Sequence, residues 1–256
     1  MQNKGQSHQN PNVVAIIQAR MGSTRLPGKV LKKVLAKPLL EYQIERLNRC
    51  KLINTLVVAT TTKQSDNPIV ELCNQLGVNV FRGSEEDVLQ RYYDAACKYK
   101  ADVVVRLTAD CPLIDPEVVD KVISCYLENQ EQYDYVSNTL IRTYPRGLDT
   151  EVFSFQALKQ AHQEAHDPQY REHVTSYLYL HPEKFRLFNV SHPIDYSHHR
   201  WTVDTGEDFE LIRRIIEHLY PQNAMFKMKE TITLLEYKPE WALINAHIEQ
   251  KKINQE

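Results

Sequence analysis

The fold is decided by residues 13–29, which read VVAIIQARMGSTRLPGK. Residues 13–19 form a short apolar run rich in β-branched side chains, a pattern typical of a buried strand in a parallel sheet. Residues 20–29 follow it and contain Gly22 and Gly28, two hydroxyl side chains and three cations. An open α/β sheet binds its ligands outside the carboxyl ends of the strands. Residues 20–29 are therefore the first candidate site.

Strands and helices alternate through the first half of the chain. Apolar spacing, proline positions and capping residues predict helices over residues 39–47, 67–76 and 84–100, and another that starts at Asp115. The helix over residues 84–100 is expected to begin at a capping pair, Ser84 with Asp87. Strands are predicted over residues 55–60, 78–81, 102–107 and 134–137. This alternation favours βαβ crossovers and one mostly parallel sheet with helices on both faces.

The pattern is less regular after residue 138. We expect strands over residues 147–153, 185–192 and 199–203, and helices over residues 155–164, 168–180 and 208–219. Residues 140–200 could form an inserted subdomain or the arm of a dimer. Residues 1–12 are polar and are expected to be a disordered tail.

The composition excludes several classes of protein. The chain has 256 residues, of which 42% are hydrophobic and 25% are charged, as is usual for a globular protein. Its five cysteines are odd in number and form no C-x-x-C pair, which argues against a disulfide framework or a thiolate zinc site. No apolar run approaches the roughly 18 residues that span a bilayer, and the start of the chain does not resemble a signal peptide. We expect a cytoplasmic protein with no membrane partner.

Positive charge is concentrated near the amino end. All 33 acidic side chains lie at or after Glu41, whereas seven of the 31 basic side chains precede it. A basic segment on an acidic body suits a compact polyanion such as a nucleotide, because a long duplex needs a basic face spread over the molecule. Nucleic acid is therefore not expected as a partner.

The candidate loop contains the groups that bind a triphosphate. Gly22 lets backbone N–H groups approach phosphate oxygens, the Ser23 hydroxyl can donate to them, and Arg20, Arg25 and Lys29 supply positive charge. A P-loop is the nearest alternative, but five residues rather than four separate Gly22 from the Gly-Lys pair, and a valine follows the lysine. A solvated basic turn is the other alternative.

Two aspartates follow predicted strands and are candidate magnesium ligands. Asp110 follows the strand over residues 102–107 and Asp204 follows the strand over residues 199–203, so both are expected at the carboxyl edge of the sheet. Mg²⁺ binds one or two protein carboxylates and leaves its other positions to phosphate and water. Asp115 and the pair Thr205 and Asp208 are better explained as helix caps, although Asp208 remains an alternative to Asp204 as the second ligand.

The loop at residues 19–29 has the pattern A-R-x-G-S-x-R-x-P-x-K, which resembles the signature loop of the CMP-sugar synthetases. These are the cytidylyltransferases that act on acylneuraminate and 3-deoxy-manno-octulosonate. Within that superfamily the chain most resembles the spore coat polysaccharide biosynthesis protein F family. Further matching segments are ATT at 59–61, RGSEEDVL at 82–89, RLTADCPLID at 106–115, RGLD at 146–149, REHVT at 171–175 and VDTGED at 203–208. The resemblance spans residues 13–219.

The resemblance implies a three-layer αβα fold of the nucleotide-diphospho-sugar transferase type (GT-A-like), with a small inserted arm or subdomain. Residues 13–256 would form a single nucleotidyltransferase domain, with residues 13–138 as the nucleotide-binding half and residues 139–256 as the acceptor-binding half. CTP would react with a ulosonic acid or a sugar phosphate to give a CMP- or CDP-sugar and pyrophosphate, for surface polysaccharide or glycoconjugate biosynthesis. Mg²⁺ is the implied cofactor, and a homodimer is implied because relatives are often dimeric.

The residues and the resemblance together give the following roles. Arg20, Lys29 and Asp110 are expected to be catalytic, and Asp110 and Asp204 are expected to bind the metal ion. Thr108 is placed to hydrogen-bond the pyrimidine base. The nucleotide-binding set comprises Ala19, Arg20, Gly22, Ser23, Arg25, Lys29 and Thr108.

On the acceptor side, the resemblance points to Arg146 and Asp149 and to the consecutive residues Arg171, Glu172 and His173. Three consecutive residues of a helix cannot share one face, so we expect at most two of this triplet to point into a site. By resemblance, an aspartate at position 110 follows the octulosonate branch rather than the acylneuraminate branch, which leaves the acceptor sugar open.

Two other classes of function remain open. A glycosyltransferase on a similar sheet would use a finished nucleotide sugar and release no pyrophosphate, but such enzymes usually have a D-x-D element, which residues 110–112 lack. A non-catalytic nucleotide-binding protein would bind CTP without turnover.

Overall fold

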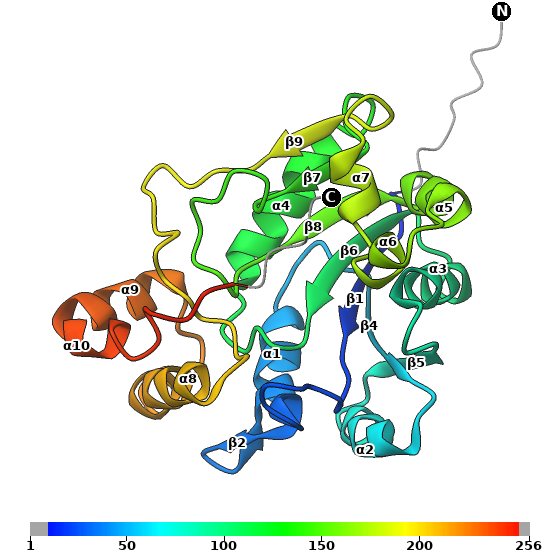
Figure 1. Ribbon diagram of the computed structural model, residues 1–256. Helices are drawn as coiled ribbons and strands as arrows, with labels where there is room; N and C mark the ends of the chain where they lie inside the picture. Colours follow the sequence, from blue (N-terminus) through cyan, green and yellow to red (C-terminus); the bar gives the residue numbers. More distant parts are fainter. Residues whose placement is uncertain (1–9, 251–256) are drawn as a thin grey trace, which may run out of the picture.

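A seven-stranded sheet forms the centre of the computed structural model, which describes residues 10–250 (Figure 1). The strands run in the order β5-β4-β1-β6-β8-β7-β9. The parallel part consists of β1 (Val13–Gln18), β4 (Thr55–Thr61), β5 (Asn79–Gly83) and β6 (Val103–Thr108). The antiparallel strand β8 (Glu151–Ser154) lies between β6 and β7 (Tyr135–Ser137), and β9 (Leu187–Asn189) is parallel to β7. The prediction of a mostly parallel sheet is confirmed.

Helices cover both faces of the sheet because its central strand is apolar on both. In β1, Val13, Ala15 and Ile17 pack against α1 (Leu39–Leu47), α2 (Asn67–Gln75) and α4 (Pro116–Glu128). Val14 and Ile16 pack on the opposite face against α3 (Val88–Lys98), α5 (Phe155–Glu164) and α7 (Ser176–Leu180). All five of these β1 side chains are buried. The predicted three-layer αβα architecture is confirmed.

A third apolar cluster lies beside the sheet. It is formed by α8 (Gly206–Leu219), α9 (Met228–Tyr237) and α10 (Pro239–Ala242), which Figure 1 shows together at one side of the molecule. Trp201 and Val203 are fully buried in this cluster, where they pack with side chains of α8. This packing holds the chain just before Asp204.

A short hairpin, β2 (Lys33–Val34) with β3 (Lys37–Pro38), precedes α1.

Two predicted helices differ from those observed. The helix predicted over residues 168–180 is divided into α6 (Pro168–Glu172) and α7. Between them Val174 has a φ of 44°, a left-handed conformation that interrupts a right-handed helix. The helix predicted from Ser84 begins at Val88, because Asp87 is its N-cap and accepts from Gln90 N at 2.8 Å. Ser84 Oγ accepts from Asp87 N at 3.1 Å.

Residues 199–203 do not form the predicted strand. The edge of β6 that such a strand would need is already paired with β8. Within the described part of the chain, this segment has only an isolated parallel bridge, from Arg200 to Arg146. It approaches the sheet at another point, where Val203 N donates to the carbonyl oxygen of Asp110 at 2.8 Å. Asp204 therefore reaches the end of β6 without belonging to a strand.

Gly147 permits the close approach of two backbone segments at this bridge. Trp201 N donates to Arg146 O at 2.7 Å, and Arg146 N donates to His199 O at 3.0 Å. Gly147 has a φ of 101°, and a Cβ atom there would lie 2.6 Å from the carbonyl carbon of Trp201. Since no side chain fits in this space and the backbone conformation favours glycine, the bridge requires glycine at this position.

Residues 1–12 were predicted to be a disordered tail. Of these, residues 1–9 lie outside the described residues. The last residue of this segment, Asn12, belongs to the fold, because its side-chain amide donates to Tyr99 O at 3.0 Å and to Lys100 O at 2.8 Å. Residues 140–200, considered as an inserted arm, instead supply β8 and β9 to the main sheet and α5 and α7 to one face of it. Among residues 10–250, no helix is both long enough and apolar enough to cross a membrane.

Candidate active site

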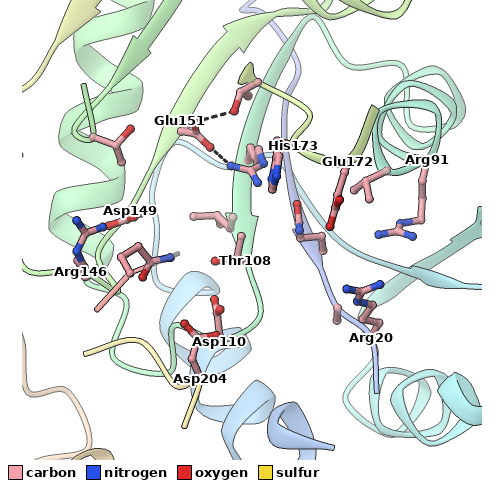
Figure 2. Close-up of a pocket in the computed structure, with 18 of the residues that line it drawn as sticks. Arg20, Arg91, Thr108, Asp110, Arg146, Asp149, Glu151, Glu172, His173 and Asp204 are labelled. Atoms are coloured by element: carbon pink, nitrogen blue, oxygen red, sulfur yellow. Dashed lines mark hydrogen bonds and ion pairs between the residues drawn. The ribbon is translucent and has the colours of Figure 1, made fainter. Parts of the chain in front are cut away.

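A cavity of about 1030 Å³ opens at the carboxyl ends of β1 and β6 (Figure 2). Both halves of the chain contribute to its walls. Figure 2 shows Arg146 and Asp149 on the side of the cavity opposite Arg20, with Asp110 and Asp204 between them. The lining residues include Ala19, Arg20, Arg25, Glu85, Arg91, Arg106, Thr108, Asp110, Arg142, Arg146, Asp149, Glu151, Glu172, His173, Asp204 and Gln250.

The loop at residues 20–29 is folded so that many of its backbone donors remain free. Within the loop, Ser23 N and Gly28 N both donate to Met21 O, at 2.9 and 3.0 Å. Gly28 has a φ of 67°, which turns the chain into the 3-10 helix Lys29–Leu31. Among the described residues, no group accepts from the backbone N–H of residue 20, 22, 24 or 25. The loop thus presents several N–H donors, together with two arginine side chains on the cavity wall.

Asp66 anchors this loop, a role that was not predicted from the sequence. It is 2% exposed, and its Oδ1 accepts from Met21 N at 2.8 Å. Its Oδ2 accepts from the hydroxyls of Thr60 and Thr61. Burial alone would raise the pKa of Asp66, but the hydrogen bonds from Thr61, Met21 and Thr60 outweigh burial and lower the pKa. Asp66 follows β4 after a short turn, a position that gives no sign in the sequence of a contact with residue 21.

Asp110 and Asp204 share one cation, the ammonium group of Lys29. Lys29 Nζ lies 3.0 Å from Asp110 Oδ2 and 2.8 Å from Asp204 Oδ1. Burial alone would raise the pKa of Asp110, but the Lys29 charge and several hydrogen bonds lower it to about 2. Burial alone would lower the pKa of Lys29, and the two carboxylates raise it. Asp110 and Lys29 are therefore both charged at neutral pH.

Asp204 is also held by two arginines. Its Oδ2 lies 3.0 Å from the Arg25 guanidinium and accepts from Arg200 Nη2 at 2.7 Å. Asp208 is fully buried, and accepts from Arg200, from the side chain of Asn245 and from Asp204 N. Asp208 therefore has no oxygen available for a metal ion, which removes it as an alternative ligand.

The predicted helix caps are confirmed. Asp208 and Thr205 form a capping box at the start of α8, in which Thr205 Oγ1 accepts from Asp208 N at 3.2 Å. Asp115 caps α4, where its Oδ1 accepts from Glu117 N at 2.9 Å. Neither acid is free to bind a ligand through these atoms.

Asp110 and Asp204 fit a magnesium site of the kind expected for a nucleotide. Their oxygens already converge on one positive charge, beside the cationic loop. Within residues 10–250, no group of three or more histidine, cysteine or acidic side chains is arranged to hold a metal ion. Two carboxylates are nevertheless sufficient for Mg²⁺, which takes the rest of its oxygen ligands from phosphate and water.

Arg142 and Arg146 both line the cavity, and of these two only Arg142 forms an ion pair with an acid among the described residues. Arg142 binds both oxygens of Asp149, at 2.6 and 2.8 Å. Arg146 lines the same wall, and among the described residues it has no ion-pair partner. Burial, followed by the neighbouring charge of Arg142, lowers the pKa of Arg146. An unneutralised guanidinium in a partly buried wall favours an anionic ligand.

Of the triplet at residues 171–173, Glu172 and His173 line the cavity and Arg171 does not. Arg171 Nη2 binds Asp87 Oδ2 at 2.6 Å, and Arg171 Nη1 donates to His162 O at 3.0 Å. Because Asp87 is the N-cap of α3, this arginine ties α6 to the start of α3. Arg171 therefore lies outside the lining of this cavity, and acceptor binding by Arg171 stays a prediction.

A buried network at the floor of the cavity was also missed. Glu151 accepts from Arg106, from Tyr135 Oη at 2.6 Å and from Thr175 Oγ1 at 2.8 Å. Burial alone would lower the pKa of Arg106, but the charge of Glu151 raises it. Both carboxylate oxygens of Glu151 thus already accept hydrogen bonds within the protein.

Thr108, at the end of β6, lines the cavity. Its carbonyl oxygen accepts from Gln43 Nε2 at 2.8 Å.

Residues 14–236 match the family model described as "Cytidylyltransferase". The spore coat polysaccharide biosynthesis protein SpsF of Bacillus subtilis is 35% identical, over 90% of this chain and 97% of that protein. A solved structure of a cytidylyltransferase from Leptospira borgpetersenii has a TM-score of 0.87 and 37% identity, over 91% of this chain and 97% of the other. A 3-deoxy-manno-octulosonate cytidylyltransferase of Geobacter sulfurreducens is 34% identical over 46% of each chain.

Proposed function

Because the chain belongs to the cytidylyltransferase family, we propose that it transfers the cytidylyl group of CTP to a ulosonic acid or a sugar phosphate and releases pyrophosphate. The family makes the protein a nucleotidyltransferase of the CMP-sugar synthetase superfamily. The observation that carries the proposal is the position of Asp110 and Asp204, whose carboxylates converge on one cation beside the loop at residues 20–29. Triphosphate chemistry requires such an arrangement of acids and cations.

The chain contributes mainly positioning and charge. The free N–H groups of the loop and the side chains of Arg20 and Arg25 bind the phosphate oxygens, and Lys29 adds a third positive charge beside them. Asp110 and Asp204 would hold Mg²⁺. When bound, this ion neutralises phosphate oxygens and lowers the pKa of the attacking group.

The acceptor would bind between Arg146, on the wall opposite Arg20, and the side chains of His173 and Glu172, of which Figure 2 shows Glu172 on the side of Arg20. Arg146 would bind its carboxylate or phosphate group, because it is the lining arginine of this wall that no described acid neutralises. Asp149 acts on the acceptor site indirectly, since it holds Arg142. The names of the relatives support a role in surface polysaccharide or glycoconjugate biosynthesis. A cytoplasmic location and a homodimer stay predictions.

Pyrophosphate release tests the proposal. The chain would be incubated with each of the four nucleoside triphosphates and with a panel of 3-deoxy-manno-octulosonate, N-acetylneuraminate and hexose 1-phosphates, with and without MgCl₂. We expect release with CTP, with Mg²⁺ and with at least one acidic sugar. CTP binding without release would indicate a nucleotide-binding protein, and transfer from a finished nucleotide sugar would indicate a glycosyltransferase.

Asp110→Ala should reduce this release by at least about 100-fold, since it removes one of the two acids proposed to hold the metal ion. The exposed Glu183→Ala is the matched control and should be as active as the unmodified chain. Circular dichroism should show both variants folded. Full activity of Asp110→Ala would contradict the proposed mechanism.

A further inference from the structure

The C-terminal segment, residues 243–250, returns from α10 to the cavity. Figure 1 shows this part of the chain, in red, running from the side of α9 and α10 toward the sheet. It follows the residues that match the family model, which end at residue 236. Its last described residue, Gln250, lines the cavity together with Asp204 and Arg146.

Asn245 fixes the segment to the site. Its side chain is 2% exposed, and its Nδ2 donates to Arg200 O at 2.9 Å and to Asp208 Oδ1 at 2.8 Å. Both acceptors belong to the group that holds Asp204. A buried amide with both donors satisfied anchors the chain at one place, and the segment beyond it is thereby directed to the cavity.

Gln250 is oriented by the same arginine. Arg200 Nη1 donates to Gln250 Oε1 at 2.7 Å. The orientation of this amide follows from chemistry, because a guanidinium can only donate and so the atom that faces it must be the oxygen. Among residues 10–250, no group accepts from Gln250 Nε2. The amide therefore holds two N–H donors on the cavity wall, with its oxygen already used.

The neighbours of Gln250 belong to the acceptor side. Arg200 is bridged to Arg146, and Figure 2 shows Arg146 on the wall opposite Arg20 and the phosphate-binding loop. An acidic sugar on this wall offers carboxylate, phosphate and hydroxyl oxygens, which are the groups that N–H donors bind. The unneutralised charge of Arg146 favours the same class of ligand.

We propose that Gln250 is an acceptor-binding residue that donates from its amide nitrogen to an oxygen of the acidic sugar, and that Asn245 and Arg200 position it. This inference rests on the proposed function and adds to it a residue from the C-terminal segment. Arg200 has a second task in this arrangement, because the same guanidinium holds Asp204.

Two substitutions at residue 250 separate donation from positioning. Gln250→Ala removes both the donor and the contact with Arg200. Gln250→Glu keeps an oxygen for Arg200 but replaces the donors with a second oxygen and a negative charge. Kinetics would be measured with CTP, MgCl₂ and the panel acid for which the unmodified chain has the highest kcat/KM. We expect Gln250→Ala to raise the acceptor KM about tenfold and Gln250→Glu to raise it at least as much.

The KM for CTP should stay within about twofold of the unmodified value in both variants, because Gln250 is proposed to contact the acceptor and not CTP. Glu249→Ala, an exposed neighbour, is the matched control. A chain that ends at Gln250 should also keep the normal acceptor KM, whereas a chain that ends at Glu249 should behave like Gln250→Ala. Thermal unfolding of each variant verifies that the fold is intact.

Three outcomes would overturn the inference. If Gln250→Glu retains the normal acceptor KM while Gln250→Ala does not, the residue only positions Arg200. If both variants retain it, Gln250 does not bind the acceptor, although the proposed function stands. If the unmodified chain releases no pyrophosphate with any acid of the panel, the proposed function fails and this inference fails with it.

Discussion

Asp110 and Asp204 are linked twice, once through the ammonium group of Lys29 and once through the backbone, where Val203 N donates to Asp110 O at 2.8 Å. The backbone link sets the separation of the two acids. The lysine then neutralises them in a place where two unpaired carboxylates would repel each other. The site is therefore assembled by contacts between two distant parts of the chain.

Removal of the shared cation should weaken both stability and activity. In Lys29→Met, two largely buried carboxylates lose their common partner, so we expect the free energy of unfolding without metal to fall by about 2 kcal/mol. MgCl₂ should raise the unfolding midpoint of this variant more than that of the unmodified chain, because the ion replaces the lost charge. Calorimetry of both proteins, with the exposed Lys33→Met as control, tests this. Equal responses to MgCl₂ would contradict it.

Substitution of Arg171 should affect stability, whereas substitution of its neighbour Glu172 should affect the acceptor KM. Arg171→Ala breaks the ion pair with Asp87 and should lower the free energy of unfolding by about 1 kcal/mol, since both side chains are partly exposed. Its acceptor KM should hardly change. Glu172→Ala should leave stability nearly unchanged and alter the acceptor KM. Unfolding curves and acceptor kinetics of the two variants distinguish these roles, and a large KM effect in Arg171→Ala alone would return Arg171 to the acceptor site.

The stabilisation that Asp66 gives to the loop at residues 20–29 should depend on pH. The folded state lowers the pKa of Asp66 from its ordinary value of 3.8. Such a group stabilises the fold above its unfolded pKa, and this contribution is lost as the pH falls through the lower, folded pKa. Asp66→Asn should therefore be less stable than the unmodified chain at pH 7, and the difference should shrink as the pH falls below 3.8. Urea unfolding at several pH values measures it, and a difference independent of pH would show that the charge of Asp66 is unimportant.

Gly147→Ala should be strongly destabilising. A Cβ atom would clash with the Trp201 backbone, and the residue has a φ of 101°, so we expect a loss of about 3 kcal/mol or more. Gly77→Ala is the matched control, because Gly77 also has a positive φ but has no atom within 4 Å of the added Cβ. It should lose only about 1 kcal/mol. Similar losses in the two variants would mean that conformation, and not the close approach to Trp201, decides the effect.

The parts of the fold that could be predicted are those encoded locally. The buried strands appear as apolar runs such as residues 13–19, and the caps at Asp115 and Thr205 appear as short motifs. The hairpin of β2 and β3 and the helices α9 and α10 were not predicted. The hairpin strands are two residues long, which is too short for a hydrophobic period to emerge.

The candidate site was predictable to the extent that its residues follow strands. Asp110 and Asp204 both line the cavity, but Asp204 arrives there through packing of Trp201 and a backbone bridge rather than through a strand. Asp66 and Gln250 could not be found, because their contacts depend on how distant segments meet. The same holds for Arg171, whose partner Asp87 lies 84 residues earlier in the chain.

The pairing of β8 with β6 bears on attempts to redesign this protein. The strand β8, which follows residue 138, pairs with β6, so an exchange of residues 139–250 between relatives would also exchange a structural neighbour of β6. The backbone N–H that corresponds to Val203 would then come from another protein, and it would still have to donate to the carbonyl oxygen of Asp110. Engineers who seek a new sugar preference should graft individual side chains onto the existing backbone rather than swap the halves as modules.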